Sequence, residues 1–260
     1  MNTFKKLLSV LLVLTMVFCF CACGNDEAAV EDGGAEVPHY ICVTEPTFPP
    51  FDSTDENGEF IGFDKDLMDA VAEDQGFTVE YVCLEFDALI PALQSNQGQI
   101  ITAGMNSLVP ERAEKVDFCT PYYDSGLILM VKKDSGINGI DDLTPDMSVA
   151  SQIGTTGGEL TQKLYDEGKI KEAVVLGQYT TCALQLESGA VDAVWVDYAV
   201  GGEFVKAYDD LALVREAQNH EAYEFAVQKG NAELLQKIND GLANLKKNGT
   251  YDQLFAKWGL

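Results

Sequence analysis

The sequence predicts an α/β protein with two lobes, and three observations favour that fold class. Strand-like and helix-like segments alternate from about residue 40, as in parallel sheets covered by helices. The same alternation starts again after Gly126, which predicts a second sheet. The segment from residue 39 to the C-terminus is roughly 220 residues long, enough for one large domain or two modest ones.

The first lobe is expected to begin with a short apolar strand at 40–44 and a second apolar segment at 60–63. A helix over 64–73, with apolar residues at helical spacing, should stop at Gly76. A strand at 77–84, a helix that Asp87 can cap and a strand at 99–103 should follow. The DENG run at 55–58 lacks the later ligands of a calcium loop and is interpreted as a hairpin turn.

After Gly126, strands are expected at 127–131, 147–150, 174–175 and 191–196. Helices are expected at about 159–167 and 181–188. The final long helix should span 232–247, where leucine and isoleucine recur at helical spacing.

The N-terminus has the pattern of an export signal. Lys5 and Lys6 precede an apolar run at 7–20. This run of about 14 residues is short for a hydrocarbon core that requires about 20, so a transmembrane helix is the weaker interpretation. The signal ends in a segment similar to a bacterial lipobox, with Ala22 before Cys23, although Phe20 replaces the usual leucine. Ordinary cleavage near Ala22 is the alternative.

A diacylglycerol on Cys23 would anchor the chain stably, because it supplies two acyl chains. Residues 24–38 are acidic and small with no apolar period, so we expect a flexible tether. Together, these segments predict an exported lipoprotein held at the cell surface or in the periplasm.

The chain is strongly acidic, with 42 acidic and 17 basic residues and a formal net charge of -25. Nucleic acid and anionic lipid surfaces would repel such a chain. Acidity of this kind favours solubility and does not identify a ligand.

Four cysteines follow the leader: Cys42, Cys83, Cys119 and Cys182. Exported cysteines can form disulfides, and four allow two. Each of these lies singly, however, and Cys42 and Cys83 lie inside apolar segments, where a thiol behaves as a small hydrophobe. No pair has the spacing of a zinc site, so we favour buried free thiols and expect no metal or cofactor.

Several short motifs carry a resemblance to a known family. They are TFPPF at 47–51, GFD at 62–64, FDALIPAL at 86–93, PER at 110–112, VDF at 116–118, PYY at 121–123, GTT at 154–156, VDAV at 191–194 with Asp197, and LKKNGTY at 245–251 with KWG at 257–259. In order and spacing, residues 40–260 resemble the polar amino-acid-binding proteins of ABC importers (bacterial extracellular solute-binding proteins, family 3), here in a lipoprotein form.

The resemblance implies a periplasmic-binding-protein-like α/β fold of type II, with two lobes joined by a two-strand hinge. The signal peptide would occupy 1–23 and the linker 24–38. Lobe 1 would comprise 39–124 and 223–260, and lobe 2 would comprise 125–222. The implied function is capture of a free L-amino acid in the cleft and delivery to a membrane permease, by a monomer that is not an enzyme.

The resemblance also implies which residues hold the ligand. An amino acid carries a carboxylate and an ammonium, and neither leaves water cheaply without a partner. Arg112 is the candidate for the carboxylate, since a guanidinium donates two parallel hydrogen bonds. Ser107 and Thr156 would add donors from lobe 1 and lobe 2. Asp197 is the candidate for the ammonium.

Each assignment has a structural alternative. Arg112 could be a solvated residue at a helix start, Asp197 could cap the next helix, and Thr156 could be a turn residue. Phe48 and Phe86 match positions that pack the ligand side chain, where an aromatic face suits a cation, but core packing is an alternative. Glu45 is a hint of a basic ligand.

Three departures from the family pattern are visible. The segment 104–109 before Pro110 is one residue longer, which makes the role of Ser107 uncertain. The usual aspartate ahead of this strand is replaced by Gln99 or Ile101, and Cys119 stands where serine is common.

An enzyme is the main competing class. With only His39 and His220, no Gly-x-Ser-x-Gly, no His-Glu-x-x-His and no phosphate loop, most mechanisms are disfavoured. Dehydratases of prephenate-like acids share this fold, and a second carboxyl in the cleft beside Asp197 would be their sign. A sensory protein that docks a receptor is the third hypothesis.

Overall fold

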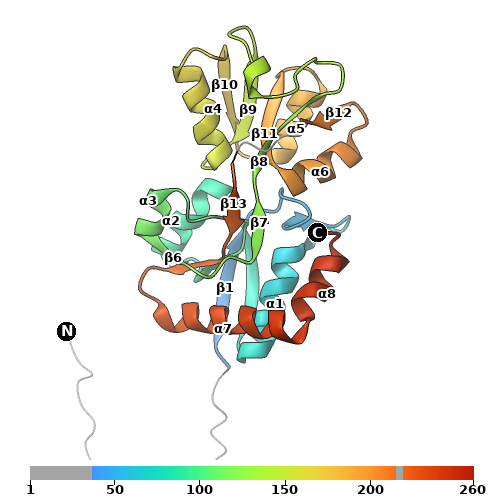
Figure 1. Ribbon diagram of the computed structural model, residues 1–260. Coiled ribbons are helices and arrows are strands. Elements are labelled where there is room, and N and C mark those ends of the chain that lie inside the picture. The colour runs from blue at the N-terminus through green and yellow to red at the C-terminus, as the bar shows by residue number, and fades with distance from the viewer. Residues whose placement is uncertain (1–36, 215–218) are drawn as a thin grey trace, which may run out of the picture. The chain divides into compact units, whose positions relative to one another are not determined.

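The computed structural model describes residues 37–214 and 219–260 (Figure 1). The export signal at 1–23, the acylation site Cys23 and the linker up to residue 36 lie outside the described residues. Among the helices that are described, none is long and apolar enough to cross a membrane.

The first five-stranded sheet has the order β4-β1-β5-β14-β6. Its strands are β1 (His39–Thr44), β4 (Thr78–Cys83), β5 (Ile100–Ile101), β6 (Val116–Phe118) and β14 (Ala226–Gln228). β1 is parallel to β4 and β5, whereas β14 is antiparallel to β5 and β6. The predicted parallel arrangement is confirmed for β1, β4 and β5, but the sheet as a whole is mixed, because the returning strand β14 enters it in the opposite direction.

The helices of this lobe include segments far apart in the chain. They are α1 (Phe63–Gln75), the short 3-10 helix η1 (Phe86–Ala88), α2 (Leu89–Gln94), α3 (Pro110–Lys115), α7 (Ala232–Asn248) and α8 (Thr250–Lys257). α1 ends at Gly76 as predicted, in the left-handed conformation that glycine adopts without a steric cost. Asp87 does not cap a helix, because it lies inside η1, and neither η1 nor α2 has a side-chain cap.

The second five-stranded sheet has the order β10-β9-β11-β8-β12. Its strands are β8 (Leu127–Lys132), β9 (Ser148–Gln152), β10 (Glu172–Leu176), β11 (Ala193–Asp197) and β12 (Leu211–Leu213). The accompanying helices are η2 (Ile140–Asp142), α4 (Thr156–Asp166), α5 (Tyr179–Glu187) and α6 (Tyr198–Ala207). β9 is parallel to β10 and β11, but β8 is antiparallel to β11 and β12, so this sheet is mixed as well.

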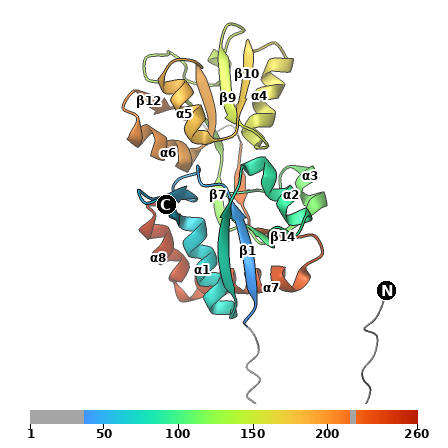
Figure 2. The ribbon, with the colours of Figure 1, turned by 180° about the vertical axis from the view of Figure 1, so that it is seen from behind.

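Two strands connect the sheets. β7 (Tyr123–Ser125) and β13 (Glu221–Tyr223) form an antiparallel pair in which Tyr123 lies opposite Tyr223. All strands of the second sheet lie between β7 and β13 in the sequence, so the chain leaves the first lobe through β7 and returns through β13 (Figures 1 and 2). The predicted fold class, two α/β lobes with a two-strand hinge, is confirmed.

The DENG segment forms a hairpin turn, as predicted. It joins β2 (Ser53–Thr54) to β3 (Phe60–Ile61), which pair antiparallel. Asp55 Oδ1 accepts hydrogen bonds from the backbone nitrogens of Asn57 and Glu59, at 2.8 and 2.9 Å. The aspartate therefore stabilises the turn itself.

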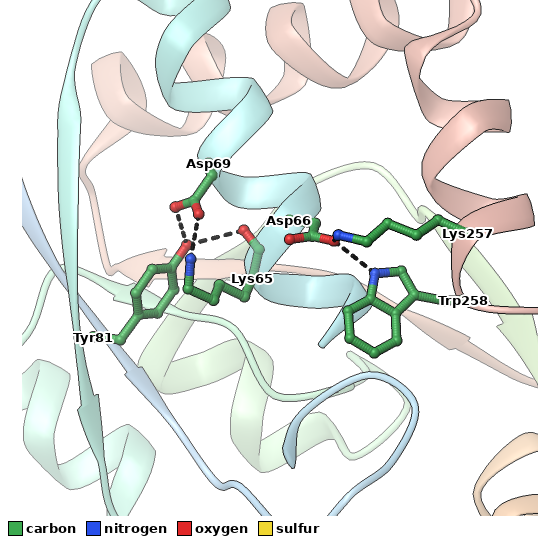
Figure 3. Close-up of polar contacts among 6 residues, drawn as sticks. All are labelled: Lys65, Asp66, Asp69, Tyr81, Lys257 and Trp258. Carbon is green, nitrogen blue, oxygen red and sulfur yellow. Dashed lines mark hydrogen bonds and ion pairs between the residues drawn. The ribbon is translucent and has the colours of Figure 1, made fainter. Parts of the chain in front are cut away.

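The KWG motif at the C-terminus fixes α8 to α1 (Figure 3). Lys257 Nζ and Trp258 Nε1 both donate to Asp66 Oδ2, at 2.6 and 2.7 Å. Further along α1, Tyr81 of β4 donates to Asp69 Oδ1 at 2.8 Å. Through α1, these contacts join the chain's last helix to the first sheet.

All four cysteines after the leader are free thiols. Cys42, Cys119 and Cys182 are buried, as expected. Cys83 is exposed, which contradicts the expectation of burial, because it ends β4 and β4 is the edge strand of the first sheet.

Candidate functional site

One cavity draws its lining from both lobes and from the hinge. Arg112, Thr156, Asp197, Phe48 and Phe86, which were predicted from the sequence, all line it. Other lining residues were not predicted as site residues: Ala103, Gly104, Asn106, Gln152, Thr155, Tyr179 and Glu221. Ser107 and Glu45 are absent from its lining.

Arg112 brings a buried cation to the cavity. It lies on α3, which Pro110 begins, and is only 6% exposed. Its Nη1 donates to the backbone oxygen of Asn106 at 3.0 Å and to Asn106 Oδ1 at 3.1 Å. Its Nη2 donates to the backbone oxygen of Gly154, in the other lobe, at 2.8 Å.

No carboxylate of the described residues lies within 4 Å of the Arg112 guanidinium. Burial lowers the pKa of Arg112, and the nearby charge of Glu221 opposes that effect. An arginine remains a cation in proteins even so. Because a buried charge without a counter-ion is costly, this guanidinium is poised to accept an anion.

Asp197 brings a buried carboxyl from the second lobe. It is the last residue of β11, a strand that is buried along its whole length. The side chain is 5% exposed and accepts a hydrogen bond from Ser125 Oγ of β7 at 3.1 Å. It occupies the position before α6 but makes no side-chain capping bond there, so the capping alternative receives no support.

The environment of Asp197 favours its neutral form in the absence of a cation. Burial, and then the negative charge of Glu221, raise the pKa of Asp197 to about 7. A ligand cation placed against this carboxyl would reverse the effect, since an opposite charge favours ionisation.

The two threonines of the GTT turn make different hydrogen bonds. Thr155 Oγ1 accepts a hydrogen bond from Gly158 N at 3.0 Å and caps α4. This leaves the hydroxyl of Thr156, the first residue of α4, free to reach across to Glu221 Oε1 at 2.6 Å. Thr156 is thus more than a turn residue.

Glu221 is the main site residue that sequence reasoning missed. It lies on the hinge strand β13, is 2% exposed and faces Ser125 across the strand pair. It accepts hydrogen bonds from Thr156 Oγ1, from Asn219 Nδ2 at 2.9 Å and from Asn106 Nδ2 at 2.8 Å. Its position beside the lobe boundary expected at 222–223 was the available signal. Glu221 is the second cleft carboxyl beside Asp197 that was named as the sign of a dehydratase.

Asn106, rather than the predicted Ser107, is the polar residue of this segment that lines the cavity. Its side chain bridges Arg112 and Glu221. The backbone nitrogen of Ser107 instead donates to Glu224 Oε2 at 2.8 Å, outside the cavity lining. Asn106, and not Ser107, therefore lines the cavity in this segment, which is one residue longer than the family pattern.

The segment also passes close to Phe48. Gly104 has φ 52°, and a Cβ there would lie 2.5 Å from Phe48 Cε1, so only glycine fits. The Phe48 ring lies 5.5 Å from that of Tyr179, in the second lobe. The Phe86 ring lies 5.5 Å from Arg112 Cζ, within the range of a cation–π contact with the arginine itself.

Glu45 is buried next to the cavity rather than in its lining. It accepts a hydrogen bond from Thr47 Oγ1 at 2.7 Å, and Thr47 Oγ1 accepts one from the backbone nitrogen of Tyr179 at 3.2 Å. Burial raises the pKa of Glu45. The described residues contain no cluster of three or more histidine, cysteine or acidic side chains that could hold a metal ion.

Comparison with known proteins gives consistent matches over the same span. Residues 40–260 match the family model described as bacterial extracellular solute-binding proteins, family 3. The putative ABC transporter arginine-binding protein 2 of Escherichia coli (strain K12) is 34% identical over 222 residues, which cover 83% of this chain and 88% of that protein.

Two solved structures resemble this chain in both sequence and fold. An ancestral arginine-binding protein bound to arginine is 39% identical, with a TM-score of 0.80 over 85% of this chain and 98% of the other. An ancestral amino-acid-binding protein, described as a precursor of cyclohexadienyl dehydratase, is 36% identical, with a TM-score of 0.78 over 85% of this chain and 95% of the other.

Proposed function

Because the chain belongs to family 3 of the bacterial extracellular solute-binding proteins, we propose that its interlobe cavity captures a free amino acid with a cationic side chain. The chain is an exported amino-acid-binding protein that serves import through an ABC transporter. What we propose is that the ligand has a cationic side chain and that the residues described below hold it.

The observation that carries the proposal is the charge arrangement around the cavity. Arg112 is a buried cation without a carboxylate partner within 4 Å among the described residues. Asp197, a buried carboxyl from the other lobe, lines the same cavity. A zwitterion fits this pair, with its carboxylate on Arg112 and its ammonium on Asp197. Thr156 and Asn106 would add hydrogen bonds at the carboxylate.

Glu221 supports a cationic side chain. With Arg112 and Asp197 matched to the two charges of the amino-acid backbone, Glu221 is a further buried acidic side chain that lines the cavity. A buried carboxylate favours a positive partner, so a guanidinium or a second ammonium on the ligand would balance it. The aromatic ring of Phe48 offers a face to the same kind of group. The arginine-binding relatives agree with this choice.

A thermal-shift screen tests the proposal. Arginine, lysine, ornithine and histidine should raise the melting temperature, because a ligand that binds only the native state stabilises it. Glutamate and aspartate should not. Calorimetry with arginine and with citrulline, its uncharged analogue, should show tighter binding of arginine. A protein stabilised by acidic amino acids, or by none of these compounds, would contradict the proposal.

The lipid anchor is a separate proposal for the segment before the described residues. Cys23 follows the lipobox-like segment, and acylation there would hold the chain at the membrane beside its permease. Mass spectrometry of the purified protein should find a diacylglyceryl cysteine at Cys23. The Cys23→Ala variant should lose the modification and the matched Cys21→Ala variant should keep it. Ordinary cleavage at Ala22 predicts an unmodified N-terminus instead.

The lobe boundaries and the monomeric state remain proposals as well. Lobe 1 at 39–124 and 223–260, and lobe 2 at 125–222, are supported by the strand membership of the two sheets. Size-exclusion chromatography with light scattering should give the mass of one chain.

One observation favours a second candidate function, a dehydratase of prephenate-like acids. Such an enzyme needs a general acid, and Asp197 has a pKa of about 7 with Glu221 beside it. One structural relative is a precursor of such an enzyme. Against this, Glu221 already accepts three hydrogen bonds. Incubation with prephenate and arogenate, followed by chromatography, decides the matter, because product formation would establish the enzyme.

A further inference from the structure

Two carboxyl groups lie buried together beneath the cavity. Asp52 follows the TFPPF motif, and Asp64 is the second residue of α1. Both side chains are 0% exposed, and each carboxyl lies close enough to the other to affect its pKa. No lysine, arginine or histidine nitrogen of the described residues lies within 4 Å of either one.

The hydrogen bonds leave one oxygen of each group without a donor. Asp64 Oδ2 accepts from Gly104 N at 3.0 Å and from the Tyr122 hydroxyl at 2.6 Å. Asp52 Oδ1 accepts from Thr44 Oγ1 at 3.0 Å. Asp52 Oδ2 and Asp64 Oδ1 are buried and have no hydrogen-bond partner among the described residues. A single proton between these two oxygens would satisfy both, whereas two adjacent buried carboxylates would repel each other.

We propose that Asp52 and Asp64 share one proton at neutral pH, carried by Asp52 and donated to Asp64, and that this pair positions the lobe 1 half of the ligand site. Asp64 is the better anion, because it receives two donors where Asp52 receives one. Neither carboxyl is part of the cavity lining, and the role of the pair in binding rests on the proposed function.

The pair acts through three segments that carry site residues. Gly104, which donates to Asp64, lines the cavity and lies two residues before Asn106. Asp52 pairs with Phe48 through the backbone, with Phe48 N donating to Asp52 O at 2.8 Å and Asp52 N donating to Phe48 O at 2.9 Å. Tyr122, the second donor to Asp64, immediately precedes the hinge strand β7. One buried carboxyl pair therefore joins the cavity loops to the start of the hinge.

Among the described residues, no basic side chain is a cause of the pKa shift of either carboxyl. The titratable groups that interact with the pair are Glu45, Tyr81, Cys119, Tyr122 and Tyr251, and none of them is basic. Burial, and then the charge of Asp64, raise the pKa of Asp52 well above its ordinary value. Burial raises the pKa of Asp64 to about 6.

Infrared spectroscopy without ligand tests the proton directly. At pH 8 most of Asp197 is ionised, so it adds little to the carbonyl band of protonated carboxyls. The spectrum of the parent protein minus that of Asp52→Asn should contain this band. A difference spectrum without it would overturn the proposal whatever the protein binds.

The pH dependence of stability is a second test that uses no ligand. The native pair keeps a proton that an unfolded aspartate releases near pH 3.9, so it should make the melting temperature fall as pH rises from about 5 to 8. In Asp52→Asn the amide replaces the protonated carboxyl, and this part of the slope should disappear. Identical slopes in the two proteins would contradict a shared proton.

Ligand affinity tests the positioning role. Asp52→Asn, whose amide can still donate to Asp64, should bind arginine within about threefold of the parent protein. Asp52→Leu, which leaves Asp64 without that donor, should bind at least about tenfold more weakly. If Asp52→Leu fails to fold, Tyr122→Phe removes one donor to Asp64 and should weaken binding by at least about threefold. Unchanged affinity in a folded Asp52→Leu or in Tyr122→Phe would overturn the positioning role, whereas a parent protein that binds no amino acid would refute the proposed function alone.

Discussion

The guanidinium of Arg112, in the first lobe, donates a 2.8 Å hydrogen bond to the backbone oxygen of Gly154, in the second lobe. Among the residues that the structure describes, Arg112 is the only basic one in the lining of the cavity. A guanidinium has five N–H donors, and the contacts with Asn106 and Gly154 use both terminal nitrogens without exhausting them. The arginine can therefore join the lobes and bind an anion at the same time.

Arg112→Ala should abolish or severely weaken amino-acid binding. Loss of one partner of a buried charge pair costs about 2 to 5 kcal/mol, because the other charge is left unpaired. Isothermal titration calorimetry measures the loss, and circular dichroism should show an unchanged fold. Lys171→Ala, which removes an exposed cation from the other lobe, should bind normally. Normal affinity in Arg112→Ala would remove this residue from the site.

Asp197 should make affinity depend on pH. The ligand-free carboxyl has a pKa of about 7 and must be ionised to bind an ammonium. Below pH 7 it must release a proton on binding, so affinity should fall as pH falls, by up to about tenfold per pH unit. Titrations from pH 5 to 8 measure this dependence.

Asp197→Asn is the control for that dependence. The amide cannot ionise, so at pH 8 this variant should lose about 2 to 5 kcal/mol of binding free energy relative to the parent protein. Its affinity should also depend less on pH. A profile equally steep in Asp197→Asn would assign the pH dependence to another group.

Glu221→Gln should reduce the preference for a cationic ligand side chain. The variant retains an acceptor oxygen but loses the negative charge, so arginine should lose more affinity than citrulline, by about tenfold or about 1.4 kcal/mol. Asp124→Asn is the matched control, since it removes a carboxylate from the other hinge strand whose side chain is 81% exposed. Equal losses for arginine and citrulline would assign Glu221 to the amino-acid backbone or to structure.

Asn106 and Ser107 should differ in their effect on binding. Asn106→Ala removes the side chain that connects Arg112 to Glu221 and should cost about 1 to 3 kcal/mol of binding energy. Ser107→Ala should change it by less than about 0.5 kcal/mol. Calorimetry measures the loss of binding energy in each variant. A larger loss in Ser107→Ala than in Asn106→Ala would assign the ligand contact to Ser107, as the family pattern implies.

Much of the architecture could be predicted because it depends on local patterns. The period of apolar residues, Gly76 as a helix stop and the restart after Gly126 predicted most elements and the two-lobed class. The direction of β14 and β8 could not be predicted in this way, because the pairing partners of a strand depend on the path of the whole chain. The exposure of Cys83 escaped prediction for the same reason, since an edge strand and a central strand can have similar sequences.

The sequence by itself determined the export signal pattern, the acidic charge, the family and the candidates Arg112, Asp197 and Thr156, since each depends on residue type and spacing along the chain. Only the tertiary structure decided that Glu221 faces the same cavity, that Asn106 rather than Ser107 lines it, and that Asp52 and Asp64 are buried in contact. These features join residues up to 115 positions apart, as between Asn106 and Glu221. Burial and charge at such sites arise from several segments packing together, and no single segment contains that information.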